Sequence, residues 1–202
     1  MITIIDYGMG NLGSVSNMVR KVGGSSVLTS DPKRIAAAER LILPGVGAFD
    51  YGMQQLKRLD LISVIREKAA GGTPLLGICL GMQLLASGSE EGDARGLNLV
   101  DAEIRRFAFP GDAQLAIPHV GWNEVCVVKE NPLLSMQDVA LRFYFTHSYH
   151  AVCANPPDVI ATARYGYAFT AAYSRDNVYG TQFHPEKSHR FGMQLIRNFT
   201  NL

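Results

Sequence analysis

The sequence is poor in cysteine, and this shortage narrows the class of protein. Only Cys79, Cys126 and Cys153 occur among its 202 residues. They lie far apart, cannot all pair and follow no spacing typical of metal ligands, which indicates a reducing cytoplasm. We therefore expect no bound metal and no cofactor, and we expect Cys126 and Cys153 to be small hydrophobic residues of the core.

Charge is also scarce. Charged residues make up 18% of the sequence, and the formal net charge is +1. This balance leaves no basic surface for nucleic acid or for an anionic membrane. The first residues lack the basic region and long apolar run of a signal peptide, and no window approaches the length of a membrane span. A small molecule or another protein is the expected partner.

Hydrophobic residues, at 47%, are sufficient for the core of one domain spanning residues 1–202. Short apolar runs at 2–6, 26–28, 40–43 and 74–78 predict buried strands. Apolar residues at helical spacing predict helices after residue 13, across 56–65 and directly after residue 79. Strands that alternate with helices indicate an α/β fold, with a mostly parallel central sheet flanked by helices.

From residue 97 onward the pattern changes to short strands rich in aromatic and β-branched residues. We expect strands at 97–104, 122–128, 141–145, 159–164, 169–173 and 178–183, several of them antiparallel, with a hairpin turn at 175–177. Apolar residues from about Ser188 onward recur at helical spacing and predict a closing helix. The second half therefore adds short antiparallel strands to the fold.

Loops that follow parallel strands gather at one edge of a sheet, so the segments after Asp6, Leu43 and Ile78 are expected to converge. The first of them, residues 8–13, formally matches a glycine-rich dinucleotide fingerprint, but no acidic residue ends the second strand. The second, residues 44–49, carries glycines that can present backbone amides to an oxyanion. A site at this edge is therefore expected to handle negative charge.

The third loop holds a cysteine. Gly77-Ile78-Cys79-Leu80-Gly81 predicts a strand that turns sharply into a helix, which is the arrangement of a nucleophile elbow. The two glycines allow strand and helix to approach closely, and free amides at the helix start favour a thiolate. We expect the thiol to be exposed. A buried structural cysteine is the alternative.

A histidine and a glutamate close to each other offer a base and a group to orient it. His184 and Glu186 are two residues apart, so on extended backbone their side chains point to the same side. Pro185 stiffens the backbone between them. A surface turn with a chance ion pair is the alternative for this motif alone. Beside an activated cysteine, the three residues indicate thiol acyl-transfer chemistry, with nucleophile, general base and orienting carboxylate.

These motifs and their order resemble the class I glutamine amidotransferases. The resemblance covers nearly the whole chain and implies their flavodoxin-like fold and a glutaminase activity. The motifs that carry it are Gly77 to Gly81 and His184-Pro185-Glu186. The motifs that resemble one kind of subunit within the family are Ile5 to Asn11, Pro44 to Phe49, Gly77 to Leu85, Ser89 to Gly92, Pro118 to Asn123, His147 to Tyr149 and His184 to Ser188. The resemblance implies that Cys79 attacks glutamine, with His184 and Glu186 completing the triad.

The resemblance also implies the residues that surround the substrate. Backbone amides of Val46, Gly47 and Leu80 would hold the oxyanion, and Gly47, Gln83 and Glu91 would bind glutamine. The carboxylate of Glu91 suits the ammonium of the substrate. A solvated loop acid is the alternative for Glu91.

Within the family, the motifs resemble those of subunits that form a heterodimer with a TIM-barrel cyclase of histidine biosynthesis. The implied contact residues are Asn11, His119, Trp122, Tyr149 and Lys187. Core packing is the alternative for Trp122, and a structural role is the alternative for His147. An ammonia-supplying subunit for an amidino-sugar or another acceptor, and a catalytically idle module that binds a partner, remain the alternative functions.

Overall fold

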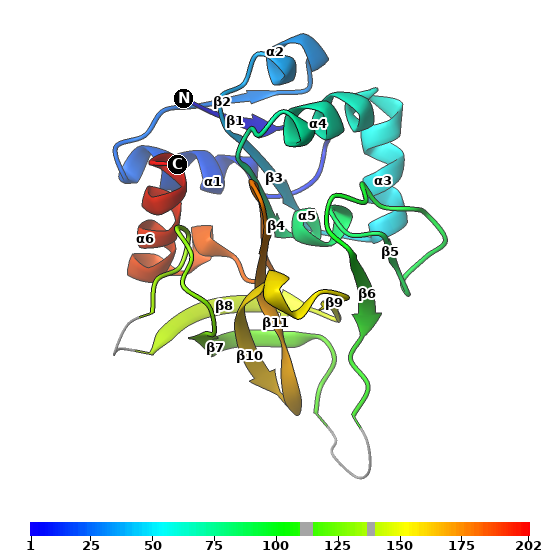
Figure 1. The fold of residues 1–202 in the computed structure, drawn as a ribbon, viewed down its shortest axis with the longest axis vertical. Helices are drawn as coiled ribbons and strands as arrows, with labels where there is room; N and C mark the ends of the chain where they lie inside the picture. The colour runs from blue at the N-terminus through cyan, green and yellow to red at the C-terminus, as the bar shows by residue number, and fades with distance from the viewer. Residues whose placement is uncertain (110–114, 137–139) are drawn as a thin grey trace.

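Parallel strands form the centre of the sheet in the computed structural model, which describes residues 1–109, 115–136 and 140–202 (Figure 1). Their order is β2-β1-β3-β4-β12, with bounds β1 (Ile2–Ile5), β2 (Ser26–Thr29), β3 (Leu41–Gly45), β4 (Leu75–Cys79) and β12 (Val178–Thr181). Every residue of β1, β3, β4 and β12 is buried, as expected for strands covered on both faces. The predicted mostly parallel core is confirmed.

Helices cover both faces of this parallel core. One face packs against α1 (Leu12–Lys21) and α6 (His189–Thr200), which place Val19 and Phe199 in a common cluster with Ile4. The other face packs against α2 (Pro32–Ala36), α3 (Phe49–Arg58), α4 (Leu61–Ala70) and α5 (Leu80–Leu84). Figure 1 shows α1 and α6 beside each other and α3 on the far side of β4.

The second half of the chain extends the sheet with antiparallel strands. Beyond β12 the order is β11-β10-β7-β8, with bounds β11 (Tyr167–Arg175), β10 (Val159–Tyr165), β7 (His119–Val127) and β8 (Leu141–His147). Three further strands, β5 (Gly88–Ser89), β6 (Ala102–Arg106) and β9 (Tyr149–Cys153), join it through β11. Arg175 pairs with Val178, so the predicted hairpin turn is confirmed.

Several expectations from the sequence were wrong. The helix predicted across 56–65 is two helices, because Asp60 adopts a left-handed conformation with φ 53° and breaks the run. The strand predicted from 97 begins at Ala102, and β5, β9 and the short α2 were not predicted. Cys126 is exposed rather than in the core, because it alternates on β7 with the buried Val125. Cys153 is partly buried.

Among the described residues, no helix has the length and apolar character needed to cross a membrane.

Candidate active site

Cys79 lies where β4 ends and α5 begins. Its backbone adopts φ 55° and ψ −111°, an unusual conformation for a residue other than glycine. A Cβ atom at Gly77 would lie 2.7 Å from the backbone nitrogen of Met82, and one at Gly81 would collide with the carbonyl of Leu43. Glycine is therefore required on both sides of the cysteine, and the predicted elbow is confirmed.

The thiol was expected to be exposed, and that was wrong. Cys79 is only 6% exposed, because the end of β8 and the residue after β12 cover it: Sγ donates toward the Thr146 carbonyl at 3.9 Å and lies 3.9 Å from the Gln182 amide. It is reached through a cavity of about 280 Å³. The residues that line this cavity are Val46, Gly47, Cys79, Leu80, Gln83, Glu91, Pro118, Thr146, His147, Ser148 and Tyr149.

A larger cavity lies elsewhere. It measures about 580 Å³ and is lined by β7, β8 and β10 residues such as Val127 and Thr162. It is lined by Cys126 and not by Cys79, so the smaller cavity is the one that leads to the cysteine of the elbow.

His184 and Glu186 form a buried pair behind the cysteine. His184 Nδ1 lies 2.7 Å from Glu186 Oε1, and the two side chains are 2% and 4% exposed. His184 is also held through its backbone, whose N–H donates to Tyr144 O at 2.9 Å and whose carbonyl accepts from Ser188 Oγ at 2.6 Å. Glu186 lies in the 3-10 turn Pro185–Lys187 rather than on the extended backbone that the sequence suggested.

The ionisation of His184 follows from its neighbours. Burial alone lowers the pKa of this imidazole, but interactions with the sulfur of Cys79 and with the carboxylate of Glu186 raise the pKa to about 9. Nε2, the ring atom not used by Glu186, forms no hydrogen bond within residues 1–109, 115–136 and 140–202. His184 is therefore a protonated imidazole at neutral pH, with one nitrogen left for proton transfer.

The turn after β3 lies beside the cysteine, as the convergence of loops predicted. Gly45 is the register partner of Cys79, and Val46 and Gly47 line the same cavity. Gly47 has φ 119°, a conformation that side chains rarely adopt, and a Cβ there would lie 2.8 Å from Met9 of the first loop. All three predicted loops therefore meet at this edge of the sheet.

Gln83 and Glu91 both line the cavity. Gln83 Nε2 donates to Tyr149 O and to Gln182 Oε1, both at 3.1 Å. Glu91 Oε2 accepts from the backbone N–H of Phe49 at 2.8 Å, where α3 begins. A carboxylate is favoured at a helix N-terminus, which fixes this negative charge beside the cavity. Gln182 and Thr146 were missed from the sequence, because they lie 103 and 67 residues from Cys79 along the chain and reach the thiol only through the tertiary fold.

The predicted contact residues differ in exposure, and two of them, Trp122 and Lys187, both lie against the ring of Tyr144. Asn11 and Lys187 are exposed, and Trp122 is 41% exposed with its ring stacked on His189 at 5.4 Å. Trp122 is therefore not a core residue. His119 is only 4% exposed, and Tyr149 belongs to the cavity wall.

No group of three or more histidine, cysteine, aspartate or glutamate side chains in the described parts of the chain could hold a metal ion.

Comparison with known proteins gives a family and relatives that match over almost the whole chain. Residues 3–202 match the family described as glutamine amidotransferase class-I. The imidazole glycerol phosphate synthase subunit HisH 2 of Methanococcus maripaludis is 50% identical over 200 residues, covering 98% of each chain. Subunit HisH 2 of Pseudomonas aeruginosa is 48% identical over 203 residues, and subunit HisH of Sulfurimonas denitrificans is 46% identical over 202 residues. These two matches cover 100% and 99% of this chain and 100% and 97% of the relatives.

Solved structures share the fold at lower identity. The structure of PurLQS from Thermotoga maritima matches with a TM-score of 0.73 at 17% identity, covering 99% of this chain and 97% of the other. A glutamine amidotransferase from the same organism matches with a TM-score of 0.65 at 21% identity, covering 92% of this chain and 75% of the other. The α/β architecture predicted from the sequence is thus the one these proteins have.

Proposed function

The chain belongs to the class I glutamine amidotransferase family, and from this premise we propose that it is the glutaminase subunit of an imidazole glycerol phosphate synthase. It hydrolyses glutamine to glutamate and passes the ammonia to a cyclase subunit of histidine biosynthesis. The observation that carries the proposal is the buried His184–Glu186 pair at 2.7 Å beside Cys79, in a chain that is 50% identical over 200 residues to a subunit named for this synthase.

The reaction proceeds by acyl transfer to sulfur. Cys79 Sγ attacks the side-chain amide carbon of glutamine, and the carbonyl π electrons move to oxygen. When the tetrahedral intermediate collapses, the C–N bond breaks and His184 Nε2–H gives its proton to the departing nitrogen, which leaves as ammonia. Water then attacks the thioester while His184 accepts its proton, and the C–S bond breaks. Glutamate is released, and the Cys79 thiolate and the His184 imidazolium with which the reaction began are restored. Glu186 holds Nδ1 of His184 through both steps, at 2.7 Å.

The negative oxygen of the tetrahedral intermediate needs donors that are in place beforehand. The backbone amides of Leu80 and of the Val46–Gly47 turn are the proposed donors, since all three residues line the cavity with Cys79. A single donor of this kind contributes about 3 kcal/mol to the transition state. The steric demands at Gly45 and Gly47 keep this turn close to the cysteine.

The cavity also provides groups for the amino-acid end of glutamine. Glu91 is proposed to bind the α-ammonium, with its carboxylate held in place by Phe49 N–H at 2.8 Å. Gln83 is proposed to orient the substrate through its contact with the Tyr149 carbonyl at 3.1 Å. Gly47 completes the wall on the side of the β3 turn.

A partner is needed because of the product. Ammonia released into water at neutral pH is mostly protonated and no longer a nucleophile, so it has to pass directly to an acceptor site. We propose a TIM-barrel cyclase subunit that uses it to form imidazole glycerol phosphate and an aminoimidazole carboxamide ribotide. The exposed Asn11, Trp122 and Lys187 are proposed contact residues, because exposed aromatic side chains are common interface anchors. Tyr149 and His119 are proposed to lie nearer the cavity, behind them.

The alternative is that the ammonia serves a different acceptor pathway. Two of the relatives are named HisH 2, and this numbering leaves the alternative open. This chain would then supply ammonia for an amidino-sugar or another acceptor. Two experiments separate the readings. The chain is expressed, together with a cyclase subunit of an imidazole glycerol phosphate synthase, in a bacterial strain that lacks its histidine-pathway glutaminase. Glutamine hydrolysis by the purified pair is then measured.

Growth without histidine and glutamate formation are both expected. Glutamate formation without growth would favour the other acceptor. No glutamate formation with any partner would favour a catalytically idle module.

A further inference from the structure

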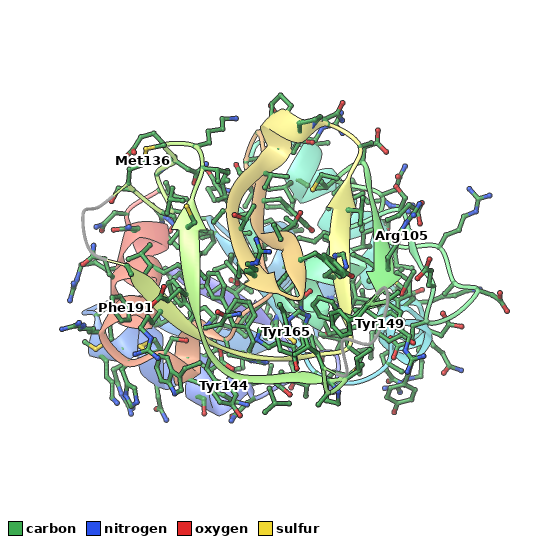
Figure 2. The ribbon with its side chains drawn as sticks, turned by 90° about the horizontal axis from the view of Figure 1, so that it is seen from below. Arg105, Met136, Tyr144, Tyr149, Tyr165 and Phe191 are labelled. Carbon is green, nitrogen blue, oxygen red and sulfur yellow. The ribbon has the colours of Figure 1, made fainter. Side chains whose placement is uncertain are left out.

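Two buried histidines outside the triad meet each other beside the cavity. His119 on β7 and His147 on β8 are register partners, and they are 4% and 6% exposed. His119 Nδ1 lies 3.0 Å from His147 Nε2. The ring of His119 is stacked on Tyr165 at 4.2 Å, and His147 itself lines the cavity that contains Cys79. Figure 2 views the molecule from below and labels Tyr165 and Tyr149, the two tyrosines that contact this pair.

The inner end of this pair fixes where the hydrogens are. His147 Nδ1 lies 2.8 Å from the carbonyl oxygen of Tyr149, and a carbonyl can only accept, so Nδ1 has the hydrogen. A neutral imidazole has only one N–H hydrogen, so His147 Nε2 must be an acceptor, and it accepts from His119 Nδ1. His119 Nε2 must then accept as well.

At the other end of the pair, the contacts of Asn123 require hydrogen bonds that run in the same direction, towards His147. Asn123 Nδ2 donates to the Arg164 carbonyl at 2.9 Å, and Asn123 Oδ1 accepts from Glu124 N–H at 2.8 Å. These two contacts fix the orientation of the amide, so the group that faces His119 Nε2 at 3.3 Å is a donor. Hydrogen bonds therefore run one way, from Asn123 through His119 and His147 to Tyr149.

Both imidazoles are held neutral by their surroundings. Burial lowers the pKa of His119 to about 4. Burial is also the main cause that lowers the pKa of His147 to about 3, opposed by its bond to Tyr149 and assisted by nearby histidines. A proton on either ring would place two N–H groups against each other.

We propose that His119 and His147 are positioning residues of the glutamine site, whose hydrogen-bond chain holds the Tyr149 carbonyl and with it the wall formed by His147, Ser148 and Tyr149. The same carbonyl accepts from Gln83 Nε2 at 3.1 Å. The series of hydrogen bonds therefore also connects this wall to α5, the helix that begins directly after Cys79. This inference rests on the proposed function, because glutamine is the ligand that the wall would position.

Kinetics of the complex with the cyclase test the inference. His119→Phe removes the donor to His147 and is expected to raise the KM for glutamine about tenfold, while kcat changes less than about threefold. His119→Asn keeps an N–H near the position of Nδ1 and is expected to stay within about threefold of the wild-type KM. His150→Phe is the matched control, since His150 is a buried histidine of the same aromatic cluster that bonds to Tyr167 Oη instead. Its KM should be that of the wild type.

An equal rise of KM in His119→Phe and His150→Phe would show a merely structural role and overturn the inference. So would a His119→Asn variant as impaired as His119→Phe.

A spectroscopic signature separates this inference from the proposed function. Imidazole 15N shifts of the complex should show His119 and His147 as Nδ1–H tautomers down to about pH 5, whereas free histidine prefers Nε2–H. His119→Phe removes one of the two signals and assigns the other. An Nε2–H tautomer on either residue would overturn the chain of hydrogen bonds even in an active enzyme. Nδ1–H tautomers in a complex that does not hydrolyse glutamine would instead contradict the proposed function.

Discussion

Two buried histidines near Cys79, His184 and His147, have pKa values shifted in opposite directions. His184 and His147 are 1% and 6% exposed, yet the pKa of His184 is raised to about 9 and that of His147 is lowered to about 3. Burial lowers the pKa of both. The difference lies in their partners: His184 interacts with Cys79 and has the carboxylate of Glu186 on Nδ1, whereas His147 has the carbonyl of Tyr149 on Nδ1 and histidines as neighbours. A charged acceptor favours the protonated imidazole of His184, which can act as an acid. A neutral acceptor leaves the imidazole of His147 neutral and holds it in one orientation.

Removing the histidine with the raised pKa should have the largest effect. His184→Ala deletes the group that protonates the departing ammonia, and we expect kcat to fall by about three to four orders of magnitude. Measured in the same complex, the control His150→Phe should keep a kcat near that of the wild type. A loss of less than tenfold in His184→Ala would contradict the assigned role.

Replacing the charged acceptor on Nδ1 of His184 with a neutral one should make the environment of His184 more like that of His147. In Glu186→Gln the carboxylate that helps to raise the pKa of His184 is gone, so that pKa should fall. In the wild type, kcat should decline as pH rises through about 9, because the imidazolium is then lost. In the variant we expect the decline to begin at lower pH, with kcat reduced about 10²-fold at neutral pH. An unchanged profile would show that Glu186 does not set the ionisation.

The two environments should also act on stability at opposite ends of the pH range. The pKa of His184 is above the unfolded value of 6.5, so its contribution is complete below pH 6.5 and is lost as pH rises towards about 9. The pKa values of His119 and His147 are below 6.5, so their contribution is present above pH 6.5 and is lost as pH falls towards about 4 and about 3. The free energy of unfolding should therefore be largest near pH 6.5.

Urea unfolding at several pH values measures this smaller effect. His184→Ala should flatten the alkaline side of the stability profile, and His119→Phe should flatten the acidic side. The assignment is contradicted if either variant flattens the wrong side.

The environment of His184 could be predicted from the sequence because it is built from local motifs. His184 and Glu186 are neighbours in the chain, and the glycines beside Cys79 have steric reasons that hold in any such turn. The parallel core followed from buried apolar runs, and the hairpin after Arg175 from its turn residues. The cavity residues of the β3 turn followed from the rule that loops gather at one sheet edge.

The second environment depends on tertiary contacts that no local pattern reports. His119 and His147 are 28 residues apart and meet only because β7 and β8 pair in that register. The burial of Cys79 has the same origin, since the covering residue Thr146 is 67 residues away in the chain. Asp60 ended a helix that apolar spacing alone would have continued, because its left-handed backbone interrupts the hydrogen bonding.

The cysteines provide the most direct test of the central claim. Cys79 is buried at the cavity proposed to bind glutamine, and Cys126 is exposed on β7. The complex is treated with a glutamine analogue that has a diazoketone in place of the side-chain amide, and its peptides are analysed by mass spectrometry. We predict one adduct, on Cys79, which excess glutamine prevents. Labelling of the accessible Cys126 while Cys79 stays unmodified would contradict the assignment of Cys79 as the nucleophile.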